Sequence, residues 1–183
     1  MIIGITGTIA SGKETFAKIA VKKGFDYYNL SDIVKKKSIA MKLNPSREIH
    51  QNLGNFLREF YGNNYLIREL VKNLNLNSNF IIDGIRNPGE IEFLRENVKN
   101  FVLIGTKSTQ KKRFERNLKR NKKTDPVNYE TFVKVDRIDR GFGQPDHGQQ
   151  VDKCIKLADF VITNNNNKKE FEEKAKQMLN KII

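Results

Sequence analysis

Residues 7–15 read GTIASGKET and follow directly on the short apolar run IIGIT. Gly7, Gly12 and Lys13 match the spacing G-x-x-x-x-G-K, a loop whose backbone N–H groups surround phosphate oxygens. Such a loop lies between a strand and a helix, and the patterns of both flank it here. Lys13 would supply a mobile positive charge for the terminal phosphates. The predicted phosphate-binding residues are Gly7, Thr8, Ile9, Ala10, Ser11, Gly12, Lys13, Glu14 and Thr15.

The residue after Lys13 departs from the usual pattern. The motif normally continues with a Ser or Thr whose hydroxyl binds Mg²⁺, whereas this chain has Glu14 there and a hydroxyl one place later, on Thr15. Thr15 is therefore the predicted metal-side hydroxyl. Two interpretations of Glu14 stand: it holds Mg²⁺-bound water, or it is a favourable acid in the first turn of a helix.

Length and composition indicate one domain. A chain of 183 residues is long enough to bury a hydrophobic core. Its one cysteine, Cys154, excludes an internal disulfide framework, fits a reducing compartment and is predicted to be a small buried apolar residue. The sequence start has no basic leader and no apolar run approaches membrane-spanning length, so we expect a cytoplasmic protein that does not contact a membrane.

The net charge of +13 is concentrated in one segment, because residues 107–123 hold nine Lys/Arg and one acid. A basic surface of this kind binds nucleic acid or polyphosphate anions. A phosphate-binding site already explains this segment, so we expect a small-molecule nucleotide as partner and do not favour nucleic acid.

Alternating strand and helix patterns predict an α/β fold. Five short apolar or β-branched runs predict buried strands, at residues 2–6, 25–30, 80–83, 101–105 and 160–163. Helical patterns separate them, at residues 16–22, 31–42, 46–61, 65–74, 90–97, 110–121, 128–138, 149–157 and 170–183. This order predicts a five-stranded parallel sheet covered on both faces, which binds ligands beyond the carboxyl ends of its strands.

Two charged residues follow the third predicted strand. Asp83 ends this strand and is predicted to hold Mg²⁺ through its water shell, the alternative being a simple cap. Arg86 lies in the following Pro/Gly turn, where its five donors suit a phosphate monoester or cap a loop. We favour the functional interpretation of both, because they share an edge of the sheet with the phosphate-binding loop.

Further arginines are predicted near the transferring phosphate. The helix at 110–121 places Arg113, Arg116 and Arg120 on one face, where they stabilise developing negative charge or form a solvated basic face. Residues 121–148 are polar and glycine-rich, which is typical of a mobile lid, and Arg137 lies within them. The predicted catalytic residues are Lys13, Arg86, Arg113, Arg116 and Arg137.

The acceptor is predicted to bind to residues 31–61. Asp32 would hydrogen-bond its base or ribose, and Arg58 would grip its phosphate together with Arg86. His50 and Gln51 are predicted to line the same pocket.

These segments resemble the nucleoside monophosphate kinase-like phosphate-loop kinases, which include adenylate kinases, deoxynucleoside monophosphate kinases and dephospho-CoA kinases. GKET resembles the GKDT of phage-type deoxynucleotide kinases, and DGIR at 83–86 resembles the DGFPR segment of adenylate kinases. Residues 147–164 are similar to the kinase-like domain attached to some deoxycytidylate deaminases, and their end resembles the AD-x-x-I-x-N of dephospho-CoA kinases.

The resemblance implies a three-layer αβα P-loop NTPase fold. Its core would comprise residues 1–30, 75–120 and 149–183, with a helical acceptor-binding insert at 31–74 and a lid at 121–148. It also implies ATP and Mg²⁺ as cofactors and places Asn164 near the adenine base.

Three functions are thus compared. The leading hypothesis is transfer of the γ-phosphoryl group of ATP to a nucleotide, above all a (deoxy)nucleoside monophosphate. The second is dephospho-CoA kinase activity. The third is a nucleotide-binding module that acts on nucleic acid or on a protein partner.

Overall fold

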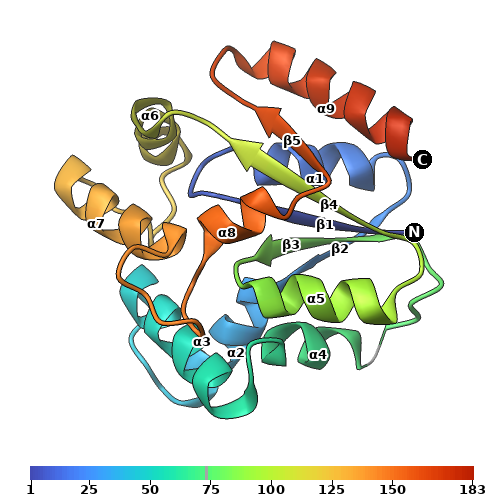
Figure 1. The fold of residues 1–183 in the computed structure, drawn as a ribbon. Helices are drawn as coiled ribbons and strands as arrows, with labels where there is room; N and C mark the ends of the chain where they lie inside the picture. Colours follow the sequence, from blue (N-terminus) through green and yellow to red (C-terminus); the bar gives the residue numbers. More distant parts are fainter. Residues whose placement is uncertain (73) are drawn as a thin grey trace.

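The computed structural model describes residues 1–72 and 74–183 and is built around a five-stranded sheet (Figure 1). All strand pairs are parallel, and the order across the sheet is β2-β3-β1-β4-β5. The strands are β1 (Ile2–Gly7), β2 (Asp26–Asn29), β3 (Phe80–Ile85), β4 (Phe101–Lys107) and β5 (Phe160–Thr163). The predicted α/β fold with a parallel sheet is confirmed.

Helices cover both faces of the sheet, which gives three layers (Figure 1). The helices are α1 (Lys13–Val21), α2 (Leu30–Ala40), α3 (Arg47–Tyr61), α4 (Tyr65–Val71), α5 (Pro88–Asn97), α6 (Gln110–Arg120), α7 (Tyr129–Arg140), α8 (Val151–Lys156) and α9 (Lys168–Ile182). The helix predicted at 65–74 ends earlier, at Val71, and its residue 73 lies outside the described residues. In the part of the chain that the structure describes, no helix has the length and apolar character needed to cross a membrane.

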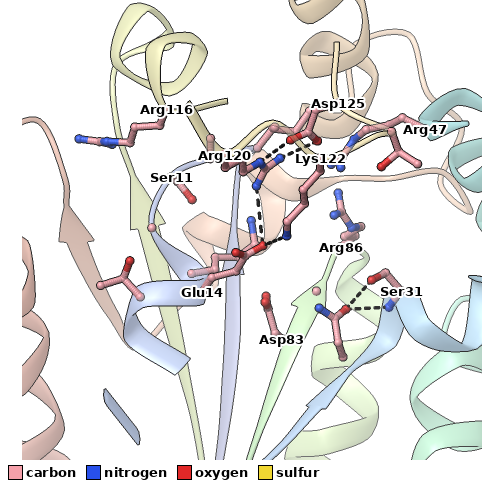
Figure 2. Close-up of a pocket in the computed structure, with 18 of the residues that line it drawn as sticks. Ser11, Glu14, Ser31, Arg47, Asp83, Arg86, Arg116, Arg120, Lys122 and Asp125 are labelled. Carbon is pink, nitrogen blue, oxygen red and sulfur yellow. Dashed lines mark hydrogen bonds and ion pairs between the residues drawn. The ribbon is translucent and has the colours of Figure 1, made fainter. Parts of the chain in front are cut away.

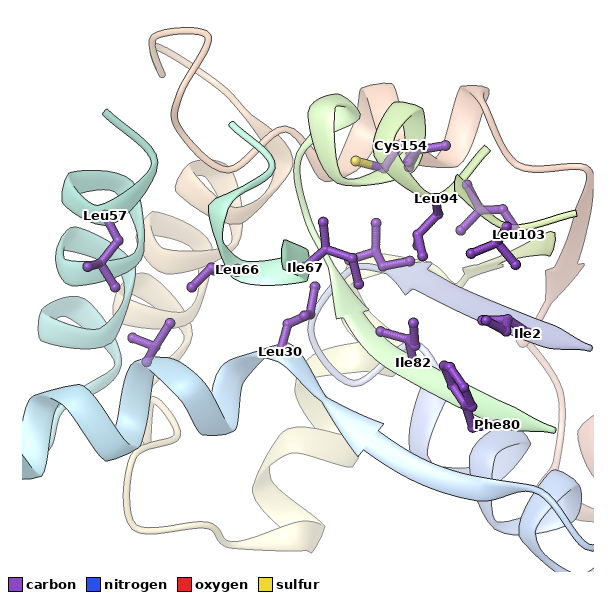
Figure 3. Packing of buried hydrophobic residues seen from close by; sticks show 14 of the residues in the cluster. Ile2, Leu30, Leu57, Leu66, Ile67, Phe80, Ile82, Leu94, Leu103 and Cys154 are labelled. Atoms are coloured by element: carbon purple, nitrogen blue, oxygen red, sulfur yellow. The ribbon is translucent and has the colours of Figure 1, made fainter. Parts of the chain in front are cut away.

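Two separate cores hold the layers together. On one face α1 and α9 pack on the sheet, and Phe16 and Phe171 lie against Ile5 and Ile81. On the other face α2, α3, α4, α5 and α8 contribute to the cluster drawn in Figure 3. Cys154 lies in this second cluster and is buried, as predicted.

The second strand differs from its prediction. The run at 25–30 predicted a buried strand, but β2 is a four-residue strand at the edge of the sheet, and Asp26 and Tyr27 are exposed. An edge strand pairs on one side only, so aromatic side chains in it do not imply burial. This prediction was wrong, and the exposed Tyr27 has a role that is discussed below.

Asp83 lies next to the phosphate-binding loop because β3 pairs with β1. Ile5 is opposite Asp83, and the register then shifts, so that Thr6 is opposite Ile85. Gly84 takes up the extra position with φ of +86°. A bulge of this kind redirects the neighbouring side chains of a strand, and here it lies directly after Asp83.

The segment predicted as a lid packs on the phosphate-binding loop. Phe132 and Val135 of α7 form a small cluster with Ile9 of the loop, and Phe114 of α6 packs against it. The boundaries predicted for the lid and for the acceptor insert stay predictions.

Candidate active site

A cavity of about 760 Å³ lies beyond the carboxyl ends of β1 and β3, between the phosphate-binding loop, α3 and residues 119–125 (Figure 2). Eleven lysines and arginines and only four carboxylates occur among its described lining residues. Low-dielectric walls that carry one sign of charge concentrate a field of that sign. The cavity is therefore suited to a ligand with several negative charges.

The backbone of the phosphate-binding loop is fixed by glycines and by neighbouring strands. Gly7 and Gly12 have φ of +152° and +120°. A Cβ on Gly7 would lie 2.3 Å from the Thr106 hydroxyl, which instead hydrogen-bonds Ser11 Oγ at 2.6 Å. Asn164 Nδ2 donates to the Ser11 carbonyl at 2.9 Å. The loop is thus held from β4 and from the segment before α9.

Lys13 is the first residue of α1 and turns back into the loop. Its Nζ donates to the carbonyls of Gly7 and Thr8, at 2.6 and 3.0 Å. Burial lowers the pKa of Lys13 to about 7, against the opposing effect of Asp83. An anion bound in the loop would favour the charged form of Lys13, which burial disfavours.

Asp83 and Thr15 offer oxygen ligands at the same cavity. Asp83 Oδ2 accepts a hydrogen bond from the Tyr27 hydroxyl at 3.0 Å. Asp83 Oδ1 is buried and has no hydrogen-bond partner among the described residues. Thr15 lines the cavity with it. A free carboxylate oxygen and a hydroxyl are hard donors of the kind that Mg²⁺ takes alongside water and phosphate oxygens, so these residues fit that ion.

Two half-buried arginines, Arg86 and Arg47, line the cavity opposite the loop, and the sequence analysis missed Arg47. Arg86 Nη1 pairs with the buried carboxylate of Asp139, and burial, with repulsion from Arg47, lowers its pKa to about 9. Arg47 is the first residue of α3; its Nε is buried without a partner, and burial, then repulsion from Arg120, lowers its pKa to about 10. A cation in the first turn of a helix opposes the helix dipole. An arginine at the predicted start of a helix was therefore the feature of the sequence that could have indicated Arg47 as a site residue.

Arg113 has a structural place instead of the predicted catalytic one. Its guanidinium is 3% exposed and pairs with Asp136, with Nη2 donating at 2.8 Å. Its Nε and Nη1 also donate to the carbonyls of Ser108 and Ile9. Arg113 is absent from the described cavity lining. The prediction is corrected, because four of the five N–H donors of this buried guanidinium bind groups of the protein itself.

Arg137 and Asp32 are also corrected. Arg137 is exposed and stacks on the ring of Phe142, 5.3 Å from its centroid. Asp32 is exposed and pairs with Lys35. Neither side chain is part of the described cavity lining, since both lie on the outer faces of their helices.

Arg58 lies in the cavity wall, but most of its guanidinium group is paired with Glu90. Its Nε and Nη2 donate to Glu90 Oε1 at 3.0 and 2.8 Å, and both side chains are buried. Only Nη1 is left without a partner among the described residues. Only this nitrogen is therefore available for the predicted contact of Arg58 with an acceptor phosphate. His50 and Gln51 line the same part of the cavity.

Arg116 and Asn164 lie together at the other end of the cavity. Arg116 Nη2 donates to the Asn164 carbonyl at 2.8 Å, and both residues line the cavity. Glu14 also reaches the cavity, but its carboxylate pairs with Lys122 and Arg120 (Figure 2). These cations lower the pKa of Glu14 against the effect of partial burial. Glu14 thus joins α1 to the start of the predicted lid.

Comparison with known proteins gives the family. A UPF0200 protein of Methanocaldococcus jannaschii is 33% identical over 189 positions, covering 98% of this chain and 88% of that protein. The chain belongs to the UPF0200 family. A UPF0200 protein of Methanothermobacter thermautotrophicus is 30% identical over 184 positions, covering 100% of this chain and 90% of that protein. A family model described as an AAA domain matches residues 3–134.

Solved structures show the same fold. Shikimate kinase from Acinetobacter baumannii aligns with a TM-score of 0.58 and 14% identity, covering 99% of this chain and 92% of that one. Dephospho-CoA kinase from Campylobacter jejuni aligns with a TM-score of 0.53 and 18% identity, covering 99% and 96%. This UPF0200 protein therefore has a P-loop kinase-like fold.

Proposed function

We propose that this chain is an ATP- and Mg²⁺-dependent kinase that transfers the γ-phosphoryl group to a (deoxy)nucleoside monophosphate. One observation carries the proposal. Lys13 and Arg47 are the first residues of α1 and α3, and both are half-buried cations that line the same cavity and whose pKa burial lowers. Each opposes the dipole of its own helix, and Arg47 Nε has no partner. Anions on both sides of one cavity would compensate these charges.

The loop side of the cavity would bind the triphosphate. The backbone N–H groups of residues 8–13 and the N-terminus of α1 favour phosphate oxygens. Lys13 Nζ would give up its hydrogen bonds to the carbonyls of Gly7 and Thr8 and bind the terminal phosphates instead. Thr15 and Asp83 would hold Mg²⁺, which when bound neutralises charge on the transferring group. Arg116 and Asn164 lie where the nucleoside of ATP would extend from the loop.

The α3 side of the cavity would bind the acceptor. Arg47 and Arg86 offer forked donors that match the oxygens of a phosphate monoester. Arg86 is partly neutralised by Asp139, so Arg47 supplies most of the uncompensated charge. A volume of about 760 Å³ is in the upper part of the range for ligand sites, which suits two substrates bound end to end.

The chemistry that these residues support is positioning and electrostatic stabilisation. Phosphoryl transfer passes through a loose transition state with charge on the equatorial oxygens. Lys13, Arg86 and Arg47 surround the point where the two substrates would meet. The cluster of Phe132, Val135 and Ile9 covers the loop and limits the access of water.

A coupled assay tests the proposal. The purified protein would be given Mg·ATP and a panel of ribo- and deoxynucleoside monophosphates, with dephospho-CoA as a further acceptor. We expect turnover of at least one monophosphate and its loss in Lys13→Met. Turnover of dephospho-CoA alone would support the second hypothesis, and ATP hydrolysis without phosphorylation of any acceptor would contradict a kinase.

A binding assay tests the third hypothesis. Electrostatic contact with RNA or DNA weakens steeply with salt. Tight binding of a single-stranded oligonucleotide at physiological salt, without kinase turnover, would favour a module that acts on nucleic acid.

A further inference from the structure

The carboxylate of Asp83 is held by an exposed residue of the edge strand. Tyr27 is 40% exposed on β2, so burial of apolar surface does not explain an aromatic residue there. Its hydroxyl donates to Asp83 Oδ2 at 3.0 Å. The other carboxylate oxygen, Oδ1, is left free and buried at the cavity that Asp83 lines. This contact therefore fixes which oxygen is available to a ligand.

The sheet register explains how Tyr27 reaches Asp83. Asn29 pairs with Asp83, and Tyr27 precedes Asn29 by two residues, so all three side chains lie on one face of the sheet. A diagonal neighbour on an adjacent strand is within reach of a long aromatic side chain. The tyrosine hydroxyl spans that diagonal.

Asn29 sets the direction of this hydrogen bond. Its Nδ2 donates to the Tyr27 hydroxyl oxygen at 2.9 Å. Because that oxygen accepts from Asn29, the hydroxyl proton is free to point at the carboxylate. The order of donors thus runs from Asn29 through Tyr27 to Asp83.

The same asparagine begins the first helix of the predicted acceptor insert. Asn29 Oδ1 accepts from Ser31 N at 2.9 Å and from Ser31 Oγ at 2.7 Å, which caps α2 (Figure 2). Gly84 leaves the room for this amide, since a Cβ there would lie 2.9 Å from Asn29 Oδ1. A continuous chain of hydrogen bonds therefore joins the start of α2 to Asp83.

We propose that Tyr27 and Asn29 are positioning residues that hold Asp83 with Oδ1 directed at the phosphate-binding cavity and tie this orientation to the start of α2. This inference rests on the proposed function, because it assumes that Asp83 serves Mg²⁺. Groups that orient a metal-binding carboxylate in this way typically change metal affinity 10–100-fold when removed.

Binding of Mn²⁺, a paramagnetic substitute for Mg²⁺, tests the proposal by electron paramagnetic resonance. The protein would be saturated with a non-hydrolysable ATP analogue and titrated with Mn²⁺. We expect Tyr27→Phe to raise the Mn²⁺ dissociation constant about tenfold, while the affinity for the analogue without metal stays unchanged. Tyr28→Phe is the matched control, because Tyr28 lies on the opposite face and packs edge-on against Phe80.

A double-mutant cycle tests the link to Asn29. Asn29→Ser keeps an oxygen that caps α2 but removes the amide that donates to Tyr27. We expect it to weaken Mn²⁺ binding in the natural chain and to have no further effect in Tyr27→Phe. Independent, additive effects of the two substitutions would overturn the relay.

Two results separate this inference from the proposed function. Wild-type Mn²⁺ affinity in Tyr27→Phe, with affinity lost in Asp83→Asn, would overturn the role of Tyr27 alone. Wild-type Mn²⁺ affinity in Asp83→Asn would contradict the metal site of the proposed function. If Tyr27→Phe weakened analogue binding equally with and without Mn²⁺, its role would be structural only, and the inference would fail.

Discussion

In the proposed function, the two sides of the cavity would bind negative charge by different means. The phosphate-binding loop uses backbone groups, which are fixed by Gly7 and Gly12 and by the contact between Ser11 and Thr106. The α3 side uses the guanidinium groups of Arg47 and Arg86. Backbone geometry is determined by the local sequence. The availability of a side-chain charge depends on whether a distant residue supplies a counter-ion.

Arg113 and Arg47 show that dependence most clearly. Both have buried guanidinium nitrogens, but Arg113 is paired with Asp136, and Arg47 Nε has no partner among the described residues. Arg113 is therefore part of the folded framework, and Arg47 keeps a donor for the ligand of the proposed function. The distinction predicts that substitution of Arg113 lowers the stability of the fold and that substitution of Arg47 lowers ligand binding. The opposite result at either residue would contradict it.

The largest effect is expected for Arg113→Met. It leaves the buried carboxylate of Asp136 without its cation, and breaking such a pair costs about 3–5 kcal/mol of stability. Chemical denaturation would measure the loss. Arg113→Met combined with Asp136→Leu should recover most of it. Arg137→Met, on an exposed arginine of α7, should cost about 1 kcal/mol or less. Equal losses for Arg113→Met and Arg137→Met would contradict the structural role.

Gly7→Ala should have the next largest effect. The added Cβ would meet the hydroxyl and carbonyl oxygens of Thr106 at 2.3 and 2.6 Å, in a backbone with φ of +152°. Left-handed strain of about 1–2 kcal/mol and overpacking together give a loss of about 3 kcal/mol. Gly24→Ala is the control, because φ is +90° there and nothing lies within 4 Å. In thermal or denaturant unfolding, Gly24→Ala should lose only the stability that corresponds to backbone strain, without the loss from overpacking.

Arg47→Met should separate binding from folding. A hydrogen bond to a charged group contributes about 1.5–3 kcal/mol, so the KM for the acceptor should rise about 10–100-fold. The free energy of unfolding should not fall, because the substitution removes a buried, repelled cation. Steady-state kinetics and denaturation of the same preparation give both numbers. A large loss of stability would place Arg47 with Arg113 instead.

The smallest effect concerns pH. The pKa of Lys13 in the free protein is about 7, and contact with phosphate would raise it, so binding above pH 7 takes up a proton. The affinity for Mg·ATP should then fall as pH rises from 7 to 8, by at most about tenfold. Below pH 7 Lys13 is already charged and contributes no dependence. Calorimetry in buffers of different ionisation enthalpy counts the protons, and Lys13→Met should abolish the slope.

The parts of the site that depend on local sequence were predictable. The spacing of Gly7, Gly12 and Lys13 predicted a loop between a strand and a helix, and the structure contains it. The position of Asp83 followed from the rule that strand ends of a parallel sheet meet at one edge. Both required only the order of elements along the chain.

The roles of the arginines were not predictable in the same way. Arg113 was expected at the transferring phosphate because it shares a helix face with Arg116, but Asp136, twenty-three residues away in the chain, pairs with it. Arg47 was missed because no motif surrounds it. The prediction of a buried strand at 25–30 was wrong because hydrophobic patterns do not distinguish an edge strand from a central one. For Arg113 and Tyr27 the deciding partner comes from another element, and for Arg47 the deciding fact is that no other element supplies one among the described residues.

The contact between the phosphate-binding loop and the segment before α9 has a consequence during synthesis. Asn164 Nδ2 bonds the Ser11 carbonyl, and Phe171 packs against Gly12 and Phe16. The phosphate-binding loop is thus supported by residues made more than 150 positions later. A nascent chain that stops before Phe171 would carry the whole motif yet lack this support, so the loop would reach its supported conformation only after Phe171 has left the ribosome.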